Sequence, residues 1–323
     1  ENQCKIISPQ ENFKEARFAL EPEKIISENT ILDVVKVLNL SQKKTEIVQE
    51  QSVITNRKEY KNFKDIRGQM HAKHAFEIAS IGGHGILMIG RPGSGKSMLA
   101  ERLPSILPPL STKELLEVSI IKSINGVSFD ADSLERPFRS PHHSSSMVSL
   151  IGGGRNVKPG EVTLAHNGVL FLDEFAELGA FGLEGLREAM GADGVSIARA
   201  EGHVSFPCRF QLIAAMNPCK CGYLGDSKRE CSRVPLCGKM YLEKISGPIL
   251  ERIDIHIDVN PSIDRKFFEF EEVEEEPSEE IRSRVLQVRE FIVQERGQKD
   301  FNNAGIPVSR FEEFCKLSSQ DLD

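Results

Sequence analysis

The chain has 323 residues, of which 39% are hydrophobic and 28% charged, and its formal net charge is −7. This length is typical of about two domains, and the apolar content excludes a disordered tail. No run of about 18 consecutive apolar residues occurs, which excludes a transmembrane helix. The acidic balance weakly disfavours a protein that coats nucleic acid.

The first 40 residues predict a small α/β piece. Residues 5–8 form an apolar strand candidate, and residues 12–20 and 29–40 have helical patterns. Residues 41–62 are polar and predict a linker. The sequence starts at Glu1 rather than Met, and its first residues lack the basic and apolar regions of a signal peptide. We therefore expect a fragment of a cytoplasmic protein.

The next part of the chain alternates between apolar runs and helical patterns. Wholly apolar runs at 85–89, 168–172 and 210–215 are typical of buried parallel strands, while 71–81 and 98–103 predict helices. Strands that recur between helices indicate βαβ units. The predicted fold class is therefore α/β, with a parallel sheet flanked by helices.

Two further segments complete the expected organisation. Residues 195–200 and 203–206 predict the two arms of a hairpin, and 281–296 predict a helix rich in Arg and Glu. Residues 269–280 contain eight Glu and no Lys or Arg, so the rest of the chain holds 41 basic and 40 acidic side chains. The negative charge is therefore concentrated in this segment, which is most simply interpreted as a solvated connector. The net charge of the whole chain is then only a weak argument against binding of nucleic acid.

Residues 90–97 match the phosphate-loop pattern G-x-x-x-x-G-K-[ST]. Its glycines let backbone N–H groups converge on phosphate oxygens, Lys96 supplies a positive charge, and the Ser97 hydroxyl is a ligand for Mg²⁺. The motif follows a predicted strand and precedes a predicted helix, which is the context that it requires. The predicted nucleotide-binding residues are Gly90, Arg91, Pro92, Gly93, Ser94, Gly95, Lys96, Ser97 and Met98.

Polar side chains follow the other two predicted strands. Asp173 and Glu174 end the run at 168–172, which places two carboxylates at the edge of the sheet where ligands bind. Asp173 is predicted to hold Mg²⁺, and Glu174 to polarise the attacking water as general base. Asn217 follows the run at 210–215 and is predicted to orient that water, the alternative being a turn-forming Asn before Pro218.

These residues, together with longer stretches, resemble the AAA+ ATPases of the magnesium-chelatase-like group, specifically the ComM/YifB family. The resemblance covers about 63–296. The stretches that carry it are FKDIRGQMHAKHAFEIAS (63–80), GRPGSGKSMLAERLPSILPPLS (90–111), RPFRSPHHSSS (136–146), LIGGGRNVKPGEVTLAHNGVLFLDE (150–174), FPCRFQLIAAMNPCKCGYLGD (206–226) and SGPILERIDIHIDV (246–259).

The resemblance implies further roles and an assembly. Asn217 corresponds to the sensor-1 position, and Arg252 to an arginine finger that acts on ATP in a neighbouring subunit of a hexameric ring. The family's sensor-2 arginine has no counterpart that we can identify here. The implied segments are a remnant of a Lon/S5-like N-terminal domain (1–40), a linker (41–62), an AAA+ core (63–265), an acidic connector (266–280) and a partial helical lid (281–323).

Four of the seven cysteines lie in a span of 19 residues. Clustered cysteines without a secretory signal indicate metal ligands before disulfides, and four thiolates suit structural Zn²⁺. Family members share a similar cluster. The alternatives are free cysteines in a loop or partial occupancy. The candidate ligands are Cys219, Cys221, Cys231 and Cys237.

Two elements are candidates for contact with nucleic acid. The segment 136–158 is rich in basic and small residues and is predicted to line a ring pore, as is the hairpin arm with Arg199 and His203. With no Trp and three Tyr, binding through base stacking is not expected. We therefore expect sequence-independent contacts to the sugar-phosphate backbone of the nucleic acid. The basic or imidazole side chains of the first segment are Arg136, Arg139, His142, His143, Arg155 and Lys158.

Three functions remain open at this point. The first is an ATP-driven ring motor on branched or single-stranded DNA, as the resemblance to a branch-migration helicase of natural transformation implies. The second is a chelatase-type motor subunit that remodels a protein partner. The third is a nucleotide-binding module without turnover. No membrane partner is expected.

Overall fold

The computed structural model describes residues 6–9, 12–13, 16, 24–39, 61–127, 135–192, 194–199, 202–224, 229, 231, 233–259, 275–296, 303–306, 308–310 and 314. The chain divides into two compact units, one of residues 1–59 with 109–135 and one of residues 60–108 with 136–323. Of the helices among the described residues, none has the length and apolar character needed to cross a bilayer.

The described part of the first unit includes a small parallel sheet and two helices. Strand β1 (Ile6–Pro9) pairs with β2 (Ile25–Glu28), which is followed by α2 (Ile31–Asn39). The strand predicted at 5–8 and the helix predicted at 29–40 are confirmed with shifted ends. Helix α5 (Thr112–Ile124) was not predicted; it begins with a capping box in which Ser111 and Glu114 exchange side-chain and backbone hydrogen bonds. The predicted helix at 12–20 and linker at 41–62 lie almost entirely outside the described residues.

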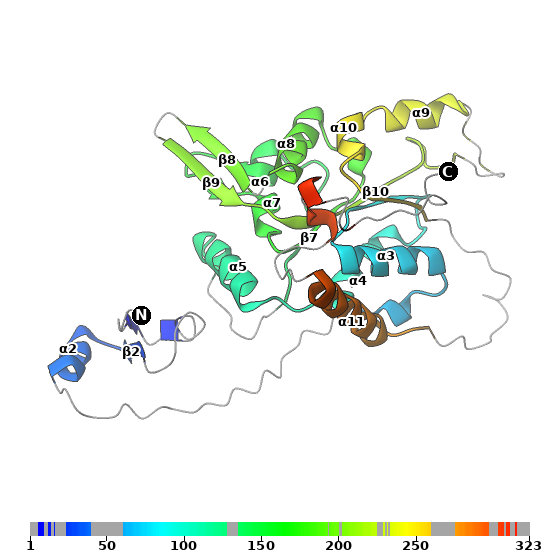
Figure 1. Cartoon of the computed structure of the whole chain (residues 1–323). Helices are drawn as coiled ribbons and strands as arrows, with labels where there is room; N and C mark the ends of the chain where they lie inside the picture. The colour runs from blue at the N-terminus through cyan, green and yellow to red at the C-terminus, as the bar shows by residue number, and fades with distance from the viewer. Residues whose placement is uncertain are drawn as a thin grey trace. The chain divides into compact units, whose positions relative to one another are not determined.

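The second unit is built on a five-stranded parallel sheet (Figure 1). The strands predicted at 85–89, 168–172 and 210–215 form its three central members, so the predicted α/β fold class is confirmed. The outer strands were not predicted. In spatial order the sheet contains β11 (Ile255–Asp258), β3 (Ile86–Ile89), β10 (Phe210–Met216), β7 (Gly168–Leu172) and β4 (Phe138–Arg139).

Alternate residues of each central strand face opposite layers of helices. On β7, Val169 and Phe171 pack into a core cluster with α3 (Met70–Gly82), α4 (Lys96–Ile106) and α11 (Ser278–Arg296). These three helices lie together beside the sheet in Figure 1. The helices predicted at 71–81, 98–103 and 281–296 correspond to them.

The other face of the sheet is covered by a second group of helices. Leu170 and Leu172 pack with residues of α6 (Met147–Ile151) and α8 (Ala180–Met190). Both faces are therefore buried, which explains why the central strands are continuously apolar. Apart from the predicted hairpin, the other elements among the described residues of this unit are η3 (Phe63–Asp65), β5 (Gly152–Gly153), β6 (Lys158–Pro159), α7 (Glu161–Leu164), η4 (Phe175–Glu177), α9 (Leu236–Leu242), α10 (Gly247–Leu250), η6 (Asn303–Gly305) and η7 (Val308–Arg310).

The predicted hairpin is confirmed. Strands β8 (Gly194–Arg199) and β9 (Gly202–Pro207) pair antiparallel, and only the base of the hairpin, around Val195 and Phe206, is buried among the described side chains. The two strands extend away from the sheet in Figure 1. The side chain of Arg199, together with Ala200 and Glu201, lies outside the described residues.

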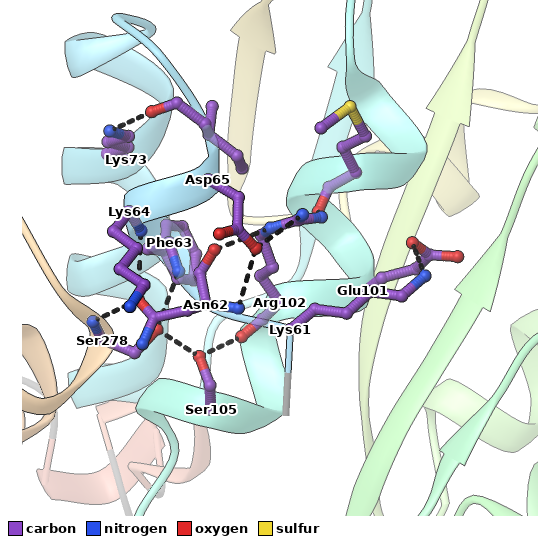
Figure 2. A network of polar contacts seen from close by, with 12 residues as sticks. Lys61, Asn62, Phe63, Lys64, Asp65, Lys73, Glu101, Arg102, Ser105 and Ser278 are labelled. Atoms are coloured by element: carbon purple, nitrogen blue, oxygen red, sulfur yellow. Dashed lines mark hydrogen bonds and ion pairs between the residues drawn. The ribbon is translucent and has the colours of Figure 1, made fainter. Parts of the chain in front are cut away.

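A polar network fixes the start of the second unit to α4 and α11 (Figure 2). Asn62 Oδ1 accepts a hydrogen bond from the backbone N–H of Ser278 at 2.9 Å, and the Asn62 carbonyl accepts one from Arg102 Nε at 2.8 Å. Arg102 also pairs with Asp65 at 3.0 Å, and Ser105 Oγ donates to Ser278 Oγ at 2.7 Å. Three segments that are distant in the sequence are thereby joined.

The described end of the acidic segment differs from the solvated connector that we expected. Glu275 pairs with Lys73 at 2.5 Å, and Glu276 pairs with Arg284. Glu279 accepts hydrogen bonds from the side chain of Asn62. Glu275 and Glu279 were misread because their partners, Lys73 and Asn62, are distant in the sequence. Residues 266–274 lie outside the described residues.

Candidate nucleotide-binding site

The phosphate loop connects β3 to α4, as its pattern predicts. Gly95 is the N-cap of α4, so the N-terminus of that helix opens onto the loop. A Cβ atom on Gly90 would lie 2.2 Å from the carbonyl oxygen of Val259, so only glycine fits where β3 ends. The backbone N–H of Gly90 donates to the carbonyl of Met216 on the neighbouring strand at 3.1 Å.

Lys96 is buried within this loop. Its Nζ donates to the carbonyl oxygens of Gly90 and Arg91 at 2.7 and 3.0 Å, and lies 3.4 Å from Asn217 Oδ1. Burial lowers the pKa of the Lys96 ammonium from its ordinary value, and the charge of Asp173 opposes that shift. The structure therefore brings together Lys96, Asp173 and Asn217, which were predicted from separate parts of the sequence.

Ser97 and Asp173 meet at the carboxyl end of the sheet. Ser97 Oγ donates to Asp173 Oδ2 at 3.0 Å, although 76 positions separate the two residues. Asp173 follows β7, and β10 lies between β7 and β3, so the parallel register carries all three strand ends to one edge. A hydroxyl and a carboxylate in contact at this edge are the donor types that Mg²⁺ prefers.

Glu174 makes a contact that sequence reasoning missed. Its backbone is left-handed (φ 51°), and its Oε2 lies 2.7 Å from Nδ1 of His143. The neighbouring His142 instead contacts Ser144 Oγ at 2.7 Å, so the two imidazoles have different partners. No local signal distinguishes His143 from His142, because the partner of His143 comes from a distant strand.

Arg252 lies apart from this group. Its Nη1 donates to the carbonyl of Pro248 at 3.0 Å, and its guanidinium lies beside Gly191 at the end of α8. Among the contacts of the described residues, it makes no hydrogen bond to the phosphate loop of its own chain. The residue is exposed.

Three of the four clustered cysteines converge in space, and the fourth, Cys221, is exposed and lies beside one of them without belonging to that group. The Sγ atoms of Cys219, Cys231 and Cys237 all lie within 4.8 Å of one another, and Cys221 Sγ lies 3.2 Å from Cys219 Sγ. Thiolates at the corners of a tetrahedron around zinc are about 3.8 Å apart, so the three grouped thiols fit such an ion, and Cys221 would have to move to become its fourth ligand. Burial raises the pKa of the Cys219 thiol, but hydrogen bonds from Cys221 and from backbone N–H groups outweigh it and lower the pKa overall.

Two of the basic residues predicted to grip phosphates are bound within the chain instead. Arg136 donates to the carbonyls of Pro108 and Asn167 at 2.7 and 2.6 Å. Arg139 pairs through two nitrogens with Glu161 at 2.6 and 2.8 Å. Sequence reasoning counted these guanidinium groups as available because their partners are not adjacent to them in the sequence.

A model of the family described as Magnesium chelatase, subunit ChlI, matches residues 62–266. The chain belongs to this family. Its membership confirms the resemblance to magnesium-chelatase-like AAA+ proteins and accounts for the phosphate loop within a parallel sheet.

Curated relatives agree with this family. Competence protein ComM of Haemophilus influenzae is 39% identical over 321 residues, which are 98% of this chain. Uncharacterized protein YifB of Escherichia coli is 39% identical over 261 residues, which are 80% of this chain. The chain spans only 62% of ComM and 50% of YifB. A more distant relative is DNA replication licensing factor mcm6 of Dictyostelium discoideum, 26% identical over 206 residues, which are 62% of this chain and 20% of mcm6.

Proposed function

We propose that the chain binds ATP with Mg²⁺ at the phosphate loop and hydrolyses it. The contact between Ser97 and Asp173, next to the Lys96–Asn217 pair, carries this proposal. When nucleotide enters, Lys96 exchanges the loop carbonyls for phosphate oxygens. Ser97 and Asp173 hold Mg²⁺, which supplies neutralisation of phosphate charge when it is bound.

The reaction is the transfer of the γ-phosphoryl group to water. Glu174 takes a proton from the attacking water, the new P–O bond forms, and the bond to the β–γ bridging oxygen breaks to leave ADP. Asn217, at the end of the adjacent strand β10, orients the water. The Glu174 carboxylate must leave His143 or share its bond in order to do so.

Arg252 acts on a neighbouring copy of the chain in this proposal. Its position away from the phosphate loop of its own chain supports a role across a subunit interface. A guanidinium at that interface stabilises the charge that develops on the transferring phosphoryl group. This arrangement needs a closed ring, and a hexamer is the size proposed.

Mixing two inactive variants tests directly whether Arg252 acts on a neighbouring copy of the chain. Lys96→Ala lacks the binding site, and Arg252→Ala lacks the finger. Mixed rings contain interfaces in which an intact phosphate loop faces an intact Arg252, so ATPase activity should partly return on mixing. No recovery in a mixture shown to co-assemble would contradict action between copies.

The work that ATP drives is proposed to be movement on DNA. The name of one relative, DNA replication licensing factor mcm6, supports DNA as the partner. The projecting hairpin with His203, and the exposed Lys158, support a sequence-independent grip on branched or single-stranded DNA. Stimulation of ATPase activity by such DNA in low salt tests this proposal, and no stimulation would contradict it.

The cysteine cluster is proposed to bind a structural Zn²⁺ through Cys219, Cys221, Cys231 and Cys237. The convergence of the Cys219, Cys231 and Cys237 thiols, with Cys221 beside Cys219, supports this assignment. Thiols that hold a metal are typical of a reducing compartment, so a cytoplasmic location is proposed.

A chelatase-type motor is the second candidate, because the matching family model is that of a magnesium chelatase subunit. In that case ATP would drive remodelling of a protein partner. The two candidates differ in what raises ATPase activity: DNA for the first, and a large chelatase subunit for the second.

A further inference from the structure

The turn at 217–222 joins the cysteine cluster to the phosphate loop. Asn217 lies two residues before Cys219, and its Oδ1 is 3.4 Å from Lys96 Nζ. The carbonyl of Cys219 accepts a hydrogen bond from the backbone N–H of Gly222 at 2.9 Å and closes the turn. One short segment therefore carries both a cluster thiol and the side chain that faces Lys96.

The same turn packs directly on the phosphate loop. Gly222 has a left-handed backbone (φ 81°), and a Cβ atom there would lie 2.7 Å from Cδ of Pro92. The backbone next to Cys221 therefore touches Pro92 with no room for a side chain. A shift of the turn would move this part of the loop or open a gap against it.

The cysteine cluster has two arms: the turn at 217–222, which carries Cys219 and Cys221, and the later segment that carries Cys231 and Cys237. The second arm packs against the first. Cys237 is followed by Gly238, where a Cβ atom would lie 2.6 Å from Cδ2 of Leu224 and 3.4 Å from the carbonyl oxygen of Pro218. The arm that supplies Cys231 and Cys237 is thus in close contact with the arm that supplies Cys219. Thiols alone join the arms only through weak hydrogen bonds, whereas a shared metal ion bonds to both.

We infer that a thiolate-bound divalent ion of the zinc class in this cluster positions Asn217 and Pro92 and thereby sets the affinity of the phosphate loop for nucleotide. The inference rests on the proposed binding of nucleotide at that loop. A purely structural zinc site would instead stabilise only its own loop and leave nucleotide affinity unchanged.

Nucleotide affinity and metal content, measured on the same samples, test the inference. The 323-residue chain is expected to bind one zinc ion. Removal of zinc by a chelator should weaken binding of a fluorescent ADP analogue about tenfold, because the turn that holds Asn217 and supports Pro92 loses its anchor. Added zinc should restore the original affinity. ADP is used so that the measurement does not depend on turnover.

Two variants separate the metal from the turn. Cys231→Ser should lose zinc and bind ADP more weakly, with no recovery on adding zinc. Gly222→Ala keeps all four thiols, so it should retain zinc and still bind ADP more weakly because its methyl group collides with Pro92. Cys208→Ser is the control, since the buried Cys208 thiol donates to the carbonyl of Ala189, outside the cluster. It should change neither zinc content nor ADP affinity.

The outcomes distinguish the inference from the proposed function. If zinc removal leaves ADP affinity unchanged, the inference is overturned while nucleotide binding stands. If the wild-type chain binds no zinc, the inference is also overturned. If zinc-loaded wild type binds no nucleotide at all, the proposed function itself fails. Unfolding of Cys231→Ser would not obscure the result, because chelation of the wild type gives the same comparison between zinc-loaded and zinc-free protein.

Discussion

His143 Nδ1 lies 2.7 Å from Oε2 of Glu174, the carboxylate that follows Asp173 at the end of β7. The proposed general base is therefore held by a side chain from the segment that follows β4. A carboxylate in this contact points toward the imidazole rather than toward a water.

Replacement of His143 by Ala should raise ATPase activity in the absence of DNA. One hydrogen bond is worth about 0.5–1.5 kcal/mol, so the expected increase in kcat is roughly twofold to tenfold. His142→Ala is the matched control, because His142 contacts Ser144 instead of Glu174. A fall in kcat for His143→Ala with normal nucleotide affinity would show that His143 assists the reaction rather than restraining the base.

Arg102→Met should destabilise the second unit. Arg102 is buried and donates to the Asn62 carbonyl and to Asp65, so the Met variant leaves these acceptors without that partner. We expect the free energy of unfolding to fall by about 2–3 kcal/mol, measured as the shift of the urea midpoint. Lys61→Met, which removes an exposed ion pair with Glu101, should cost less than about 1 kcal/mol. Equal effects of the two variants would contradict the importance of the network.

The Glu276–Arg284 pair should stabilise the fold in a pH-dependent way. The hydrogen bond from Arg284 lowers the pKa of Glu276 from its ordinary value of 4.5, so the folded state favours the ionised carboxylate. The contribution is then fully present above that ordinary value and is lost as the pH falls through the lowered one.

Urea unfolding of wild type and Glu276→Gln at several pH values measures this dependence. The wild type should be more stable by about 0.5–1 kcal/mol at pH 7, and this difference should shrink as the pH falls through the lowered pKa of Glu276. Glu280→Gln, at an exposed carboxylate of α11, is the control for the loss of one acidic side chain. If the stability difference between wild type and Glu276→Gln grew on acidification, the pKa of Glu276 would not be lowered in the folded state.

The sequence predicted the centre of the fold better than its edges. Strands β3, β7 and β10 are wholly apolar because helices cover both faces of the sheet, and that pattern is visible without a structure. Strand β11 alternates between partly buried and exposed residues, and β4 has only two residues, so neither has a strong signal. Helix α5 did carry a signal, the Ser111–Glu114 capping box, which was overlooked.

In the candidate site, too, some residues could be predicted from the sequence and others could not. Lys96, Ser97 and Asp173 could be predicted because local motifs specify them. The contact of His143 with Glu174 could not, because it depends on how the segment after β4 passes the end of β7. The pairing of Arg139 with Glu161 could not be predicted for a similar reason.

ATP binding and turnover by Glu174→Gln test the central claim most directly. The account predicts that this variant binds ATP with wild-type affinity and retains it uncleaved, because the amide cannot accept the proton of the attacking water. Lys96→Ala, measured alongside, should bind no ATP. Hydrolysis by Glu174→Gln at the wild-type rate, under conditions in which Lys96→Ala is inactive, would contradict the assignment of Glu174 as general base.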